Sequence, residues 1–316
     1  PLTEPDLSII KNLPLAIRET LRPYQEEGIA WLYDRARNDG GALLADDMGL
    51  GKTLQTLSLI HLLKGPHEPT LVVCPTSLLG NWQAECRKFF PEFNSLILHG
   101  PKRKDYFDVA HSADIIITSY ALIARDLEFY SNQKFHTLVI DEASLIRNPD
   151  TQAAKALRKL NADHRIALTG TPVENAVRDL WSLFNFLLPG YLGSRKDFQQ
   201  HYQQPLSNST SDPAIMKRLR MRVEPFMLRR TKAKVAKDLP PKILQTIYCE
   251  PSASQQKTYA QLLRQGAEKV DAMSDDQAGP ARIQILTVLL RLRQAATDLR
   301  LLDAEMDISM DEASGK

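Results

Sequence analysis

The sequence predicts an α/β domain built on a parallel β-sheet with helices on both faces. Between residues 41 and 170, short apolar runs alternate with longer amphipathic ones. Several of the short runs are almost entirely apolar, which is typical of strands buried on both faces. Alternating strands and helices favour parallel strands joined by right-handed crossovers. The predicted strands are residues 42–45, 70–74, 95–98, 114–118, 137–140 and 165–169, and the helical patterns include 54–63, 78–89 and 153–159.

The character of the sequence changes after Pro172. No buried strand is predicted beyond it until residues 243–249, and the intervening sequence is helical and basic. A second helical block is expected from residue 254 to about residue 302, with an interruption near Gly279 and Pro280.

The composition is that of a globular protein. With 316 residues, of which 43% are hydrophobic and 25% charged, the chain can form one large domain or two. No apolar run approaches the roughly 18 residues of a membrane span. Three widely spaced cysteines fit an intracellular protein with reduced thiols, and fit neither a disulfide scaffold nor a zinc site. The chain begins at Pro1, and we expect it to be part of a longer protein.

The stretch ADDMGLGKT, residues 45–53, predicts a phosphate-binding loop. An apolar strand precedes it, and Gly49 and Gly51 allow the backbone to close around phosphate oxygens. Lys52 can reach the β- and γ-phosphates, and the hydroxyl of Thr53 can bind Mg²⁺. Asp46 stands where the usual pattern has its first glycine. The alternative interpretation is a helix start that contains Gly-Lys-Thr by chance.

A second stretch, HTLVIDEAS at residues 136–144, favours the nucleotide interpretation. It reads as an apolar strand that ends in two adjacent carboxylates. Asp141 is placed to hold Mg²⁺ through water or together with Thr53, and Glu142 to orient or deprotonate the water that attacks the γ-phosphate. An isolated Asp-Glu pair usually belongs to a solvated loop, but this pair follows a buried strand. The catalytic residues are therefore predicted to be Lys52, Asp141 and Glu142.

Seven segments, taken in order, resemble the motifs of the Swi/Snf-type (sucrose-nonfermenting family) helicase-like ATPases of helicase superfamily two, and look closest to the bacterial members. The segments are LRPYQEEGIAWL, ADDMGLGKT, LVVCPTSLLGNW, IIITSY, LTGTPVEN, PFMLRRTKAKVAKDLPPK and LLRLRQAATDLRLLD. The resemblance covers nearly the whole chain from Leu21 onward. It implies a RecA-like P-loop lobe with a helical protrusion specific to the family. In such proteins ATP lies between two lobes, and double-stranded DNA binds across both.

The resemblance also assigns roles to individual residues. It implies that ATP with Mg²⁺ is bound by Gln25 at the adenine edge and by Asp46, Asp47, Met48, Gly49, Leu50, Gly51, Lys52 and Thr53, with Thr53 and Asp141 on the metal. The residues that would couple hydrolysis to lobe movement are Ser144, Thr169, Gly170 and Thr171. The residues that would contact the DNA backbone are Pro75, Thr76, Ser77, Thr118 and Ser119. The family more often has His or Gln where Ser144 stands, which implies either weaker coupling or tolerated drift.

The domain layout implied by the resemblance has four parts. Residues 1–20 are a lead-in, 21–175 the first RecA-like lobe, 176–240 a basic helical protrusion with the inter-lobe linker, and 241–316 the start of the second lobe with a helical insertion. No segment resembles the core of the second lobe or its arginine-bearing motif. We therefore expect the chain alone to bind ATP but to hydrolyse it poorly.

Residues 214–242 carry ten Lys or Arg residues against two acidic ones, in a chain with a net charge of +2. This density predicts neutralisation of DNA phosphates. The candidates for these contacts are Arg218, Arg220 and Arg222. A solvated helical face is the alternative interpretation, and Arg229 and Arg230 could instead pack against the sheet. Trp82 either contacts a sugar-phosphate strand or, as is more usual for tryptophan, lies in the core, where Trp31 and Trp181 are also expected.

Three functions are compatible with these observations. The leading hypothesis is an Mg²⁺-ATP-driven translocase on double-stranded DNA, without sequence specificity and without a membrane partner, which moves or displaces DNA-bound proteins. The second is a nucleotide-gated DNA clamp or scaffold with little hydrolysis, and the third is a strand-separating helicase. The intact set of Lys52, Asp141 and Glu142 favours an enzyme. Such a protein would act on the nucleoid of a bacterium or in a eukaryotic nucleus.

Overall fold

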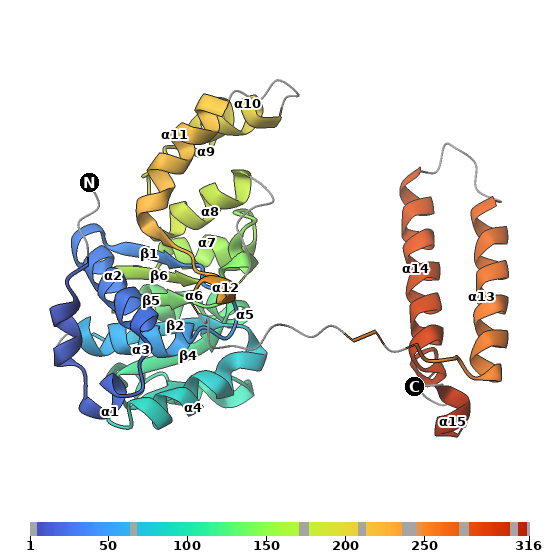
Figure 1. Ribbon diagram of the computed structural model, residues 1–316, viewed down its shortest axis with the longest axis horizontal. Helices are drawn as coiled ribbons and strands as arrows, with labels where there is room; N and C mark the ends of the chain where they lie inside the picture. Colours follow the sequence, from blue (N-terminus) through green and yellow to red (C-terminus); the bar gives the residue numbers. More distant parts are fainter. Residues whose placement is uncertain are drawn as a thin grey trace. The chain divides into compact units, whose positions relative to one another are not determined.

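The computed structural model describes residues 5–63, 68–170, 177–207, 213–235, 245–246, 248–271, 278–303 and 309–314. The chain divides into two compact units, Pro1–Leu239 and Pro240–Lys316. The first unit contains a β-sheet with its surrounding helices, and the described part of the second is helical (Figure 1). Within the part of the chain that the structure describes, no helix is both long enough and apolar enough to cross a membrane.

The first unit is built on a seven-stranded sheet in the order β3-β4-β2-β5-β6-β1-β7, and every strand pair is parallel. The strands are β1 Gly41–Leu44, β2 Thr70–Cys74, β3 Ser95–Ile97, β4 Ile115–Ser119, β5 Lys134–Ile140, β6 Asn161–Leu168 and β7 Met227–Leu228. The predicted α/β fold is confirmed. Strands β1 to β6 lie within a few residues of the predicted runs, which is the usual uncertainty of strand ends.

The helices follow the strands in regular alternation. The helices of the first unit are α1 Leu15–Arg18, α2 Pro23–Asp39, α3 Lys52–Leu63, α4 Leu79–Phe89, α5 Tyr120–Arg125, α6 Leu127–Ser131, α7 Gln152–Lys159, α8 Val177–Leu187, α9 Arg195–Phe198, α10 Gln204–Ser207, α11 Pro213–Val223 and α12 Lys232–Val235. Short 3₁₀ turns include η1 Leu7–Asn12, η2 Thr76–Leu78, η3 Pro101–Tyr106, η4 Ala110–Ser112, η5 Ala143–Ile146 and η7 Glu224–Phe226, and a π-helical turn, η6, spans Gln199–Gln203.

Helices cover both faces of the sheet (Figure 1). Along β2, the side chains of Val72 and Cys74 lie in one core cluster, whereas those of Leu71 and Val73 lie in another. The first cluster also contains side chains from α2, α3 and α4, and the second contains side chains from α5, α6, α7 and α8. Because helices cover both faces, all five residues of β2 are buried.

After Pro172 one strand is missed by the sequence and one predicted strand is wrong. The sequence predicts no buried strand before residue 243, and it gives no sign of the short, half-buried β7, which pairs with Leu43 and Leu44 of β1. Its two half-buried residues are too few to produce a recognisable strand pattern. In the predicted strand 243–249, the described residues, 245–246 and 248–249, have no regular structure, and Tyr248 is 92% exposed. A β-prone run becomes a stable strand only where partner strands and a buried face are available.

A helical protrusion extends from the first unit and has its own small core. In this core Trp181 and Phe184 of α8 pack with Phe198 of α9 and with Leu219 and Val223 of α11. The prediction that Trp181 is a core residue is therefore confirmed. Because Leu219 and Val223 hold one side of α11 against the other helices, the remaining side of α11 is free to carry charged residues at the surface.

The second unit contains α13 Ala253–Asp271, α14 Ala278–Thr297, the turn η9 Leu299–Leu301 and α15 Met310–Ala313. Gln255 of α13 joins the two long helices, because its Nε2 donates a hydrogen bond to the carbonyl oxygen of Ala295 at 3.1 Å. Gly279 and Pro280, predicted to interrupt the helical block, lie in the first turn of α14, where proline is tolerated. Residues 272–277, between α13 and α14, lie outside the described residues.

Candidate nucleotide-binding and DNA-binding sites

The predicted nucleotide residues meet at one edge of the sheet. The phosphate loop follows β1, Thr169 and Gly170 follow β6, and Asp141 follows β5. Strand β1 pairs with β6, and β6 pairs with β5. Because all three strands are parallel, these segments lie side by side at the carboxyl edge, which is where open parallel sheets bind ligands.

The phosphate loop has the conformation that its glycines predict. Gly49 and Gly51 have φ angles of 82° and 75°, in the left-handed region that favours glycine. A Cβ atom on Gly51 would lie 2.4 Å from Nε2 of Gln25, so a larger residue there would displace this amide. Helix α3 begins at Lys52, directly after the loop. The unpaired N–H groups of its first turn are therefore available to an anion held in the loop.

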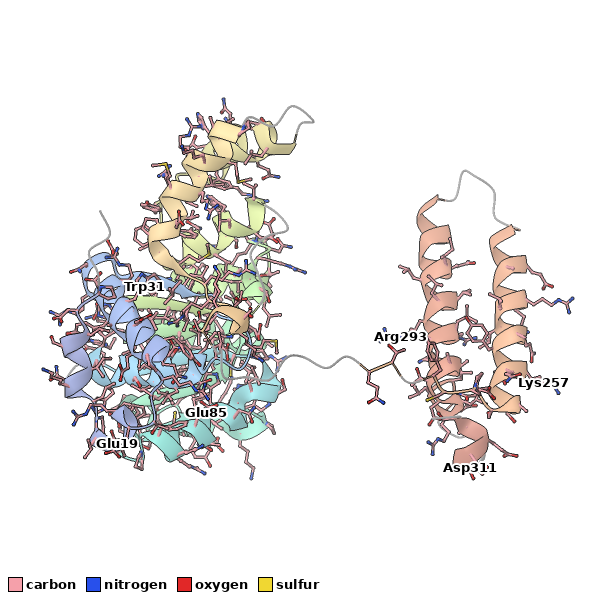
Figure 2. The ribbon with its side chains drawn as sticks, in the orientation of Figure 1. Glu19, Trp31, Glu85, Lys257, Arg293 and Asp311 are labelled. Atoms are coloured by element: carbon pink, nitrogen blue, oxygen red, sulfur yellow. The ribbon has the colours of Figure 1, made fainter. Side chains whose placement is uncertain are left out.

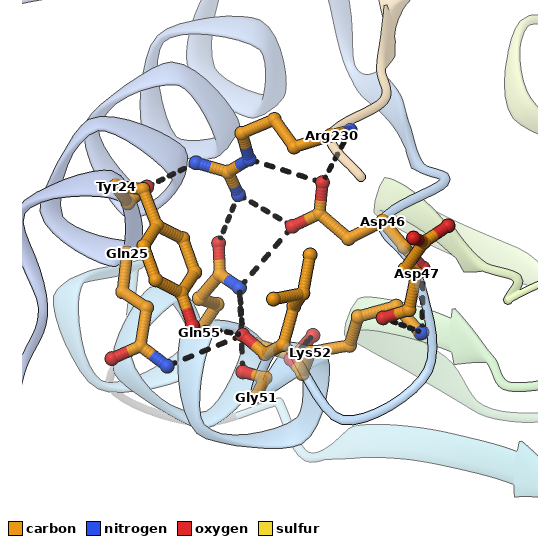
Figure 3. A network of polar contacts seen from close by, with 10 residues as sticks. Tyr24, Gln25, Asp46, Asp47, Gly51, Lys52, Gln55 and Arg230 are labelled. Atoms are coloured by element: carbon orange, nitrogen blue, oxygen red, sulfur yellow. Dashed lines mark hydrogen bonds and ion pairs between the residues drawn. The ribbon is translucent and has the colours of Figure 1, made fainter. Parts of the chain in front are cut away.

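The ammonium group of Lys52 bridges the loop. Its Nζ donates to the carbonyl oxygens of Asp46 at 2.8 Å and Asp47 at 3.3 Å (Figure 3). Burial lowers the pKa of Lys52, and the nearby carboxylates, that of Asp141 foremost, act in the opposite direction. A partly desolvated cation close to the carboxylates that follow β5 is well placed to bind the β- and γ-phosphates.

Gln25 connects the start of α2 to the phosphate loop. Its Oε1 accepts a hydrogen bond from the backbone N–H of Arg22 at 3.0 Å, which caps the helix. Its Nε2 donates to the carbonyl oxygen of Leu50 in the loop at 3.2 Å. Both ends of the amide thus bind protein groups that shape the loop. A role of Gln25 at the adenine edge remains a prediction.

Asp46 is fully buried, with 0% of its surface exposed, and forms an ion pair with Arg230 (Figure 3). Its Oδ1 accepts hydrogen bonds from the backbone N–H and the Nε of Arg230, both at 3.0 Å, and its Oδ2 accepts one from Nη2 at 2.5 Å. The guanidinium group also donates to Oε1 of Gln55 at 2.7 Å and to the carbonyl oxygen of Tyr24. The side chain of Asp46 is therefore a structural anchor, and the loop site receives only its backbone.

The segment that carries Arg230 runs along the phosphate loop. The N–H of Ala45 donates to the carbonyl oxygen of Leu228 at 2.7 Å, and the N–H of Asp47 donates to that of Arg230 at 3.0 Å. The N–H of Lys232 donates to Oδ2 of Asp47 at 3.0 Å. Sequence reasoning left open whether Arg230 packs against the sheet and missed its pairing with Asp46. One sign of this pairing is present in the sequence, namely the carboxylate of Asp46 where the loop usually has a glycine, because a charge buried there requires a partner of opposite charge.

Asp141 is held from three directions. Its Oδ1 accepts a hydrogen bond from the N–H of Glu142 at 2.9 Å, and its Oδ2 accepts one from Nε1 of Trp82 at 2.9 Å. Its carbonyl oxygen accepts one from the hydroxyl of Tyr120 at 2.6 Å. Of the two interpretations for Trp82, the core position is correct, because only 1% of the residue is exposed. Sequence reasoning missed its contact with Asp141.

Glu142 has an unusual backbone conformation. Among the described residues it is the one non-glycine with a positive φ angle, 51°. Such strain concentrates at functional sites, where the surrounding structure maintains it. Burial raises the pKa of Glu142, the neighbouring Asp141 carboxylate raises it further, and Lys52 lowers it. A carboxylate with a raised pKa is a stronger base, as the predicted role in activating water requires.

Thr53 and Asp141 fit the coordination of Mg²⁺. Hydroxyl and carboxylate oxygens are the ligands that this ion prefers, and both residues lie at the carboxyl edge of the sheet. A further residue, Glu85, enters this region from α4 (Figure 2). Burial raises the pKa of Glu85, whereas Lys88 and the nearby hydroxyl of Thr53 lower it. Sequence reasoning missed Glu85, since a single glutamate in an amphipathic helix gives no signal.

Of the residues predicted to couple hydrolysis to lobe movement, Thr169 and Gly170 lie beside the phosphate loop. Thr169 is buried, and its N–H donates to the carbonyl oxygen of Leu44 at 3.1 Å. A Cβ atom on Gly170 would lie 2.6 Å from Cγ of Met48 and 3.5 Å from Nζ of Lys52. Ser144 lies in the turn η5 that follows Glu142, and Thr171 lies outside the described residues.

The DNA residues predicted after β2 and β4 differ in their accessibility. Thr76 and Ser77 are exposed in the turn η2, and Pro75 before them is half-buried. Thr118 and Ser119 are instead buried at the end of β4, and the hydroxyl of Thr118 donates to the carbonyl oxygen of Leu98 at 3.0 Å. Both side chains are covered because β4 is an interior strand, and the DNA contacts of Thr118 and Ser119 remain a prediction.

The arginines of α11 divide into two kinds. Arg218 and Arg220 are exposed. Arg222 is tied to the protrusion: its Nη2 donates to the carbonyl oxygen of Tyr191 at 2.6 Å, and its Nη1 donates to the hydroxyl of Tyr202 at 3.3 Å. The guanidinium group of the half-buried Arg222 thus stabilises the protrusion, and its contact with DNA remains a prediction. Arg218 and Arg220 keep the predicted role.

Comparison with known proteins places these features in a family. The family profile described as the SNF2-related domain matches residues 24–301. The TATA-binding protein-associated factor mot1 of Aspergillus fumigatus is 39% identical over 274 residues, which cover 78% of this chain and 14% of that protein. YwqA of Bacillus subtilis, named as an ATP-dependent helicase/translocase, is 38% identical over 301 residues, which cover 91% of this chain and 32% of that protein.

A solved structure supports the same placement. The SWI2/SNF2 ATPase core of Sulfolobus solfataricus in complex with double-stranded DNA has a TM-score of 0.67 and 36% sequence identity to this chain. The match covers 100% of this chain and 64% of that one. The chain thus spans less than two thirds of the length of each protein with which it is compared.

Proposed function

This chain belongs to the SNF2-related family of Swi/Snf-type, helicase-like ATPases, and we propose from that premise that it is the ATP-binding lobe of an Mg²⁺-ATP-dependent translocase on double-stranded DNA. The complete protein would move or displace proteins bound to DNA. Residues 21–175 would form the first RecA-like lobe, 176–240 the protrusion and linker, and 241–316 the start of the second lobe.

The observation that carries this proposal is the placement of Lys52 opposite Asp141 and Glu142 at one edge of the sheet. The loop N–H groups and Lys52 would bind the phosphates, while Asp141 and Thr53 would hold Mg²⁺. The ion would neutralise charge on the phosphates. Glu142 would accept the proton of the attacking water, a role that its raised pKa favours.

The proposal for DNA depends on accessible groups of two elements. Thr76 and Ser77 in η2 offer hydroxyls, and Arg218 and Arg220 of α11 offer positive charge at the surface. Contacts of this kind bind phosphates and carry no direct information about base sequence. The DNA-bound structure of the Sulfolobus ATPase core supports a duplex as the ligand.

The deciding experiment measures steady-state ATP turnover of the complete protein with increasing duplex DNA. A translocase should show turnover that rises with DNA and saturates. Lys52→Ala should fail at nucleotide binding, whereas Glu142→Gln should bind nucleotide and fail at hydrolysis. Tight DNA binding without stimulated turnover would favour the clamp, and separation of the strands of a forked DNA would favour the helicase.

A further inference from the structure

Trp82 has a contact that its place in the core does not require. It lies on α4, fills the space between that helix and the sheet, and aims its indole N–H at Oδ2 of Asp141, a residue 59 positions later. A phenylalanine would fill much of the same apolar space. The N–H is thus the part of this side chain that packing alone leaves unexplained.

The hydrogen bond suits a carboxylate that also binds a metal. An indole N–H is a donor only and accepts no ligand, so it can orient the carboxylate without competing for the ion. Oδ1 of Asp141 is held at the same time by the N–H of Glu142. Each carboxylate oxygen has two lone pairs, so both oxygens keep capacity for a further ligand.

A second contact of the same helix points to the same site. Glu85 lies one turn after Trp82 on α4, and the nearby hydroxyl of Thr53 lowers the pKa of Glu85. Helix α4 thus contacts Asp141 through Trp82 and brings Glu85 close to Thr53, the other residue predicted to hold Mg²⁺. The helix also begins directly after η2, the turn predicted to contact DNA.

We propose that Trp82 is a positioning residue that holds the Asp141 carboxylate in the orientation needed to bind Mg²⁺ with the nucleotide. This inference depends on the proposed function, because it assigns Asp141 to the metal. Outer partners of metal ligands contribute in this way, and their loss typically reduces metal affinity or activity about 10- to 100-fold.

The test measures the affinity of the 316-residue protein for a fluorescent ATP analogue over a range of Mg²⁺ concentrations and in EDTA. Trp82→Phe should raise the Mg²⁺ concentration required for half-maximal tightening by about 10-fold or more. Its affinity in EDTA should stay unchanged. Trp181→Phe is the matched control, because Trp181 is also buried and its Nε1 donates to the carbonyl oxygen of Gly193 at 3.2 Å, away from the site.

The outcomes separate this inference from the proposed function. If the wild-type protein shows no tightening by Mg²⁺, both the proposed function and the role of Trp82 are wrong. If the wild type responds and Trp82→Phe responds at the same Mg²⁺ concentration, only the role of Trp82 is wrong.

A second measurement leaves Trp82 in place and so avoids a folding defect at that position. The sequence has three tryptophans, so the double variant Trp31→Phe, Trp181→Phe retains Trp82 alone. Mg²⁺ added to the nucleotide-bound variant should change the emission of Trp82, because the ion alters the charge next to its indole. Adding Asp141→Asn should remove the change. Emission that stays constant while Mg²⁺ tightens nucleotide binding would overturn the proposal.

Discussion

Asp46 supports the phosphate loop through its side chain and its backbone. Its carboxylate points away from the loop and pairs with Arg230, and its carbonyl oxygen accepts a hydrogen bond from the ammonium group of Lys52. Both members of the ion pair are buried. Removal of one member of such a pair leaves the other charge uncompensated in the interior, which is strongly destabilising.

We therefore expect Asp46→Asn to lower the free energy of unfolding by about 3–5 kcal/mol. Urea denaturation followed by circular dichroism would measure this difference. Asp47→Asn is the control, because the Asp47 carboxylate accepts a hydrogen bond from the exposed backbone N–H of Lys232. Its expected effect is about 1 kcal/mol or less. Equal losses from the two variants would contradict the anchoring role of Asp46.

We expect Glu142 to lower the stability of the fold at neutral pH and to be required for ATP hydrolysis. Its raised pKa means that the folded protein disfavours its charged form relative to the unfolded chain. Below both pKa values Glu142 is protonated in the folded and in the unfolded chain, and it does not affect stability. As the pH rises from the pKa in the unfolded chain to the higher pKa in the folded chain, the folded state loses stability, and this loss remains at higher pH. We expect Glu142→Gln to abolish hydrolysis but to raise the midpoint of urea denaturation at pH 7. This gain should vanish in acid, and a lower midpoint at pH 7 would contradict the expectation.

At the scale of elements, α11 shows how one helix divides its charges between structure and surface. Arg222 bonds to Tyr191 and Tyr202 and lies over the ring of Tyr191, at 5.2 Å from its centre. Arg220 points to solvent and is paired only loosely with Glu224, at 3.8 Å. A variant that neutralised every arginine of α11 would therefore mix a loss of DNA binding with a loss of folding.

We expect the double variant Arg218→Gln, Arg220→Gln to weaken binding to duplex DNA equally for all sequences. The slope of log affinity against log salt should decrease by about 0.9 for each DNA phosphate that the variant no longer neutralises. Arg222→Gln should instead lower the urea midpoint. An unchanged salt slope in the double variant would mean that these arginines of α11 form a solvated face and do not contact DNA.

The interior strands and the phosphate loop could be predicted from the sequence because each depends on a local pattern of residues. The interior strands, such as β2, are apolar because helices cover both of their faces, and the phosphate loop requires glycine at positive φ angles. Partners far apart in the sequence leave no such pattern. The pairing of Asp46 with Arg230 and the contact of Trp82 with Asp141 are formed only when the sheet brings their elements together.

At the scale of the whole molecule, the chain matches 14% of the mot1 protein and 32% of YwqA. We expect these 316 residues alone to bind ATP but to hydrolyse it slowly even with saturating DNA. The active centre proposed here contains Lys52, Asp141 and Glu142. Phosphoryl transfer commonly also needs an arginine, which increases kcat by about 10³- to 10⁵-fold. Turnover of the chain should be measured beside that of the complete protein. Equal rates would mean that an arginine of this chain, such as Arg147 or Arg229, reaches the phosphate.

The position of β1 in the sheet has a consequence for the order of events during synthesis. Of the seven strands of this sheet, β1 is made first, and it is flanked by β6 and β7, the last two to be made. Its residues, all buried in the finished fold, must remain unpaired until residue 161 and then residue 227 have been made. Pairings between such distant segments form slowly, and unpaired apolar strands are prone to aggregate. A growing chain of this protein therefore depends on protection of β1 until β6 and β7 have been made.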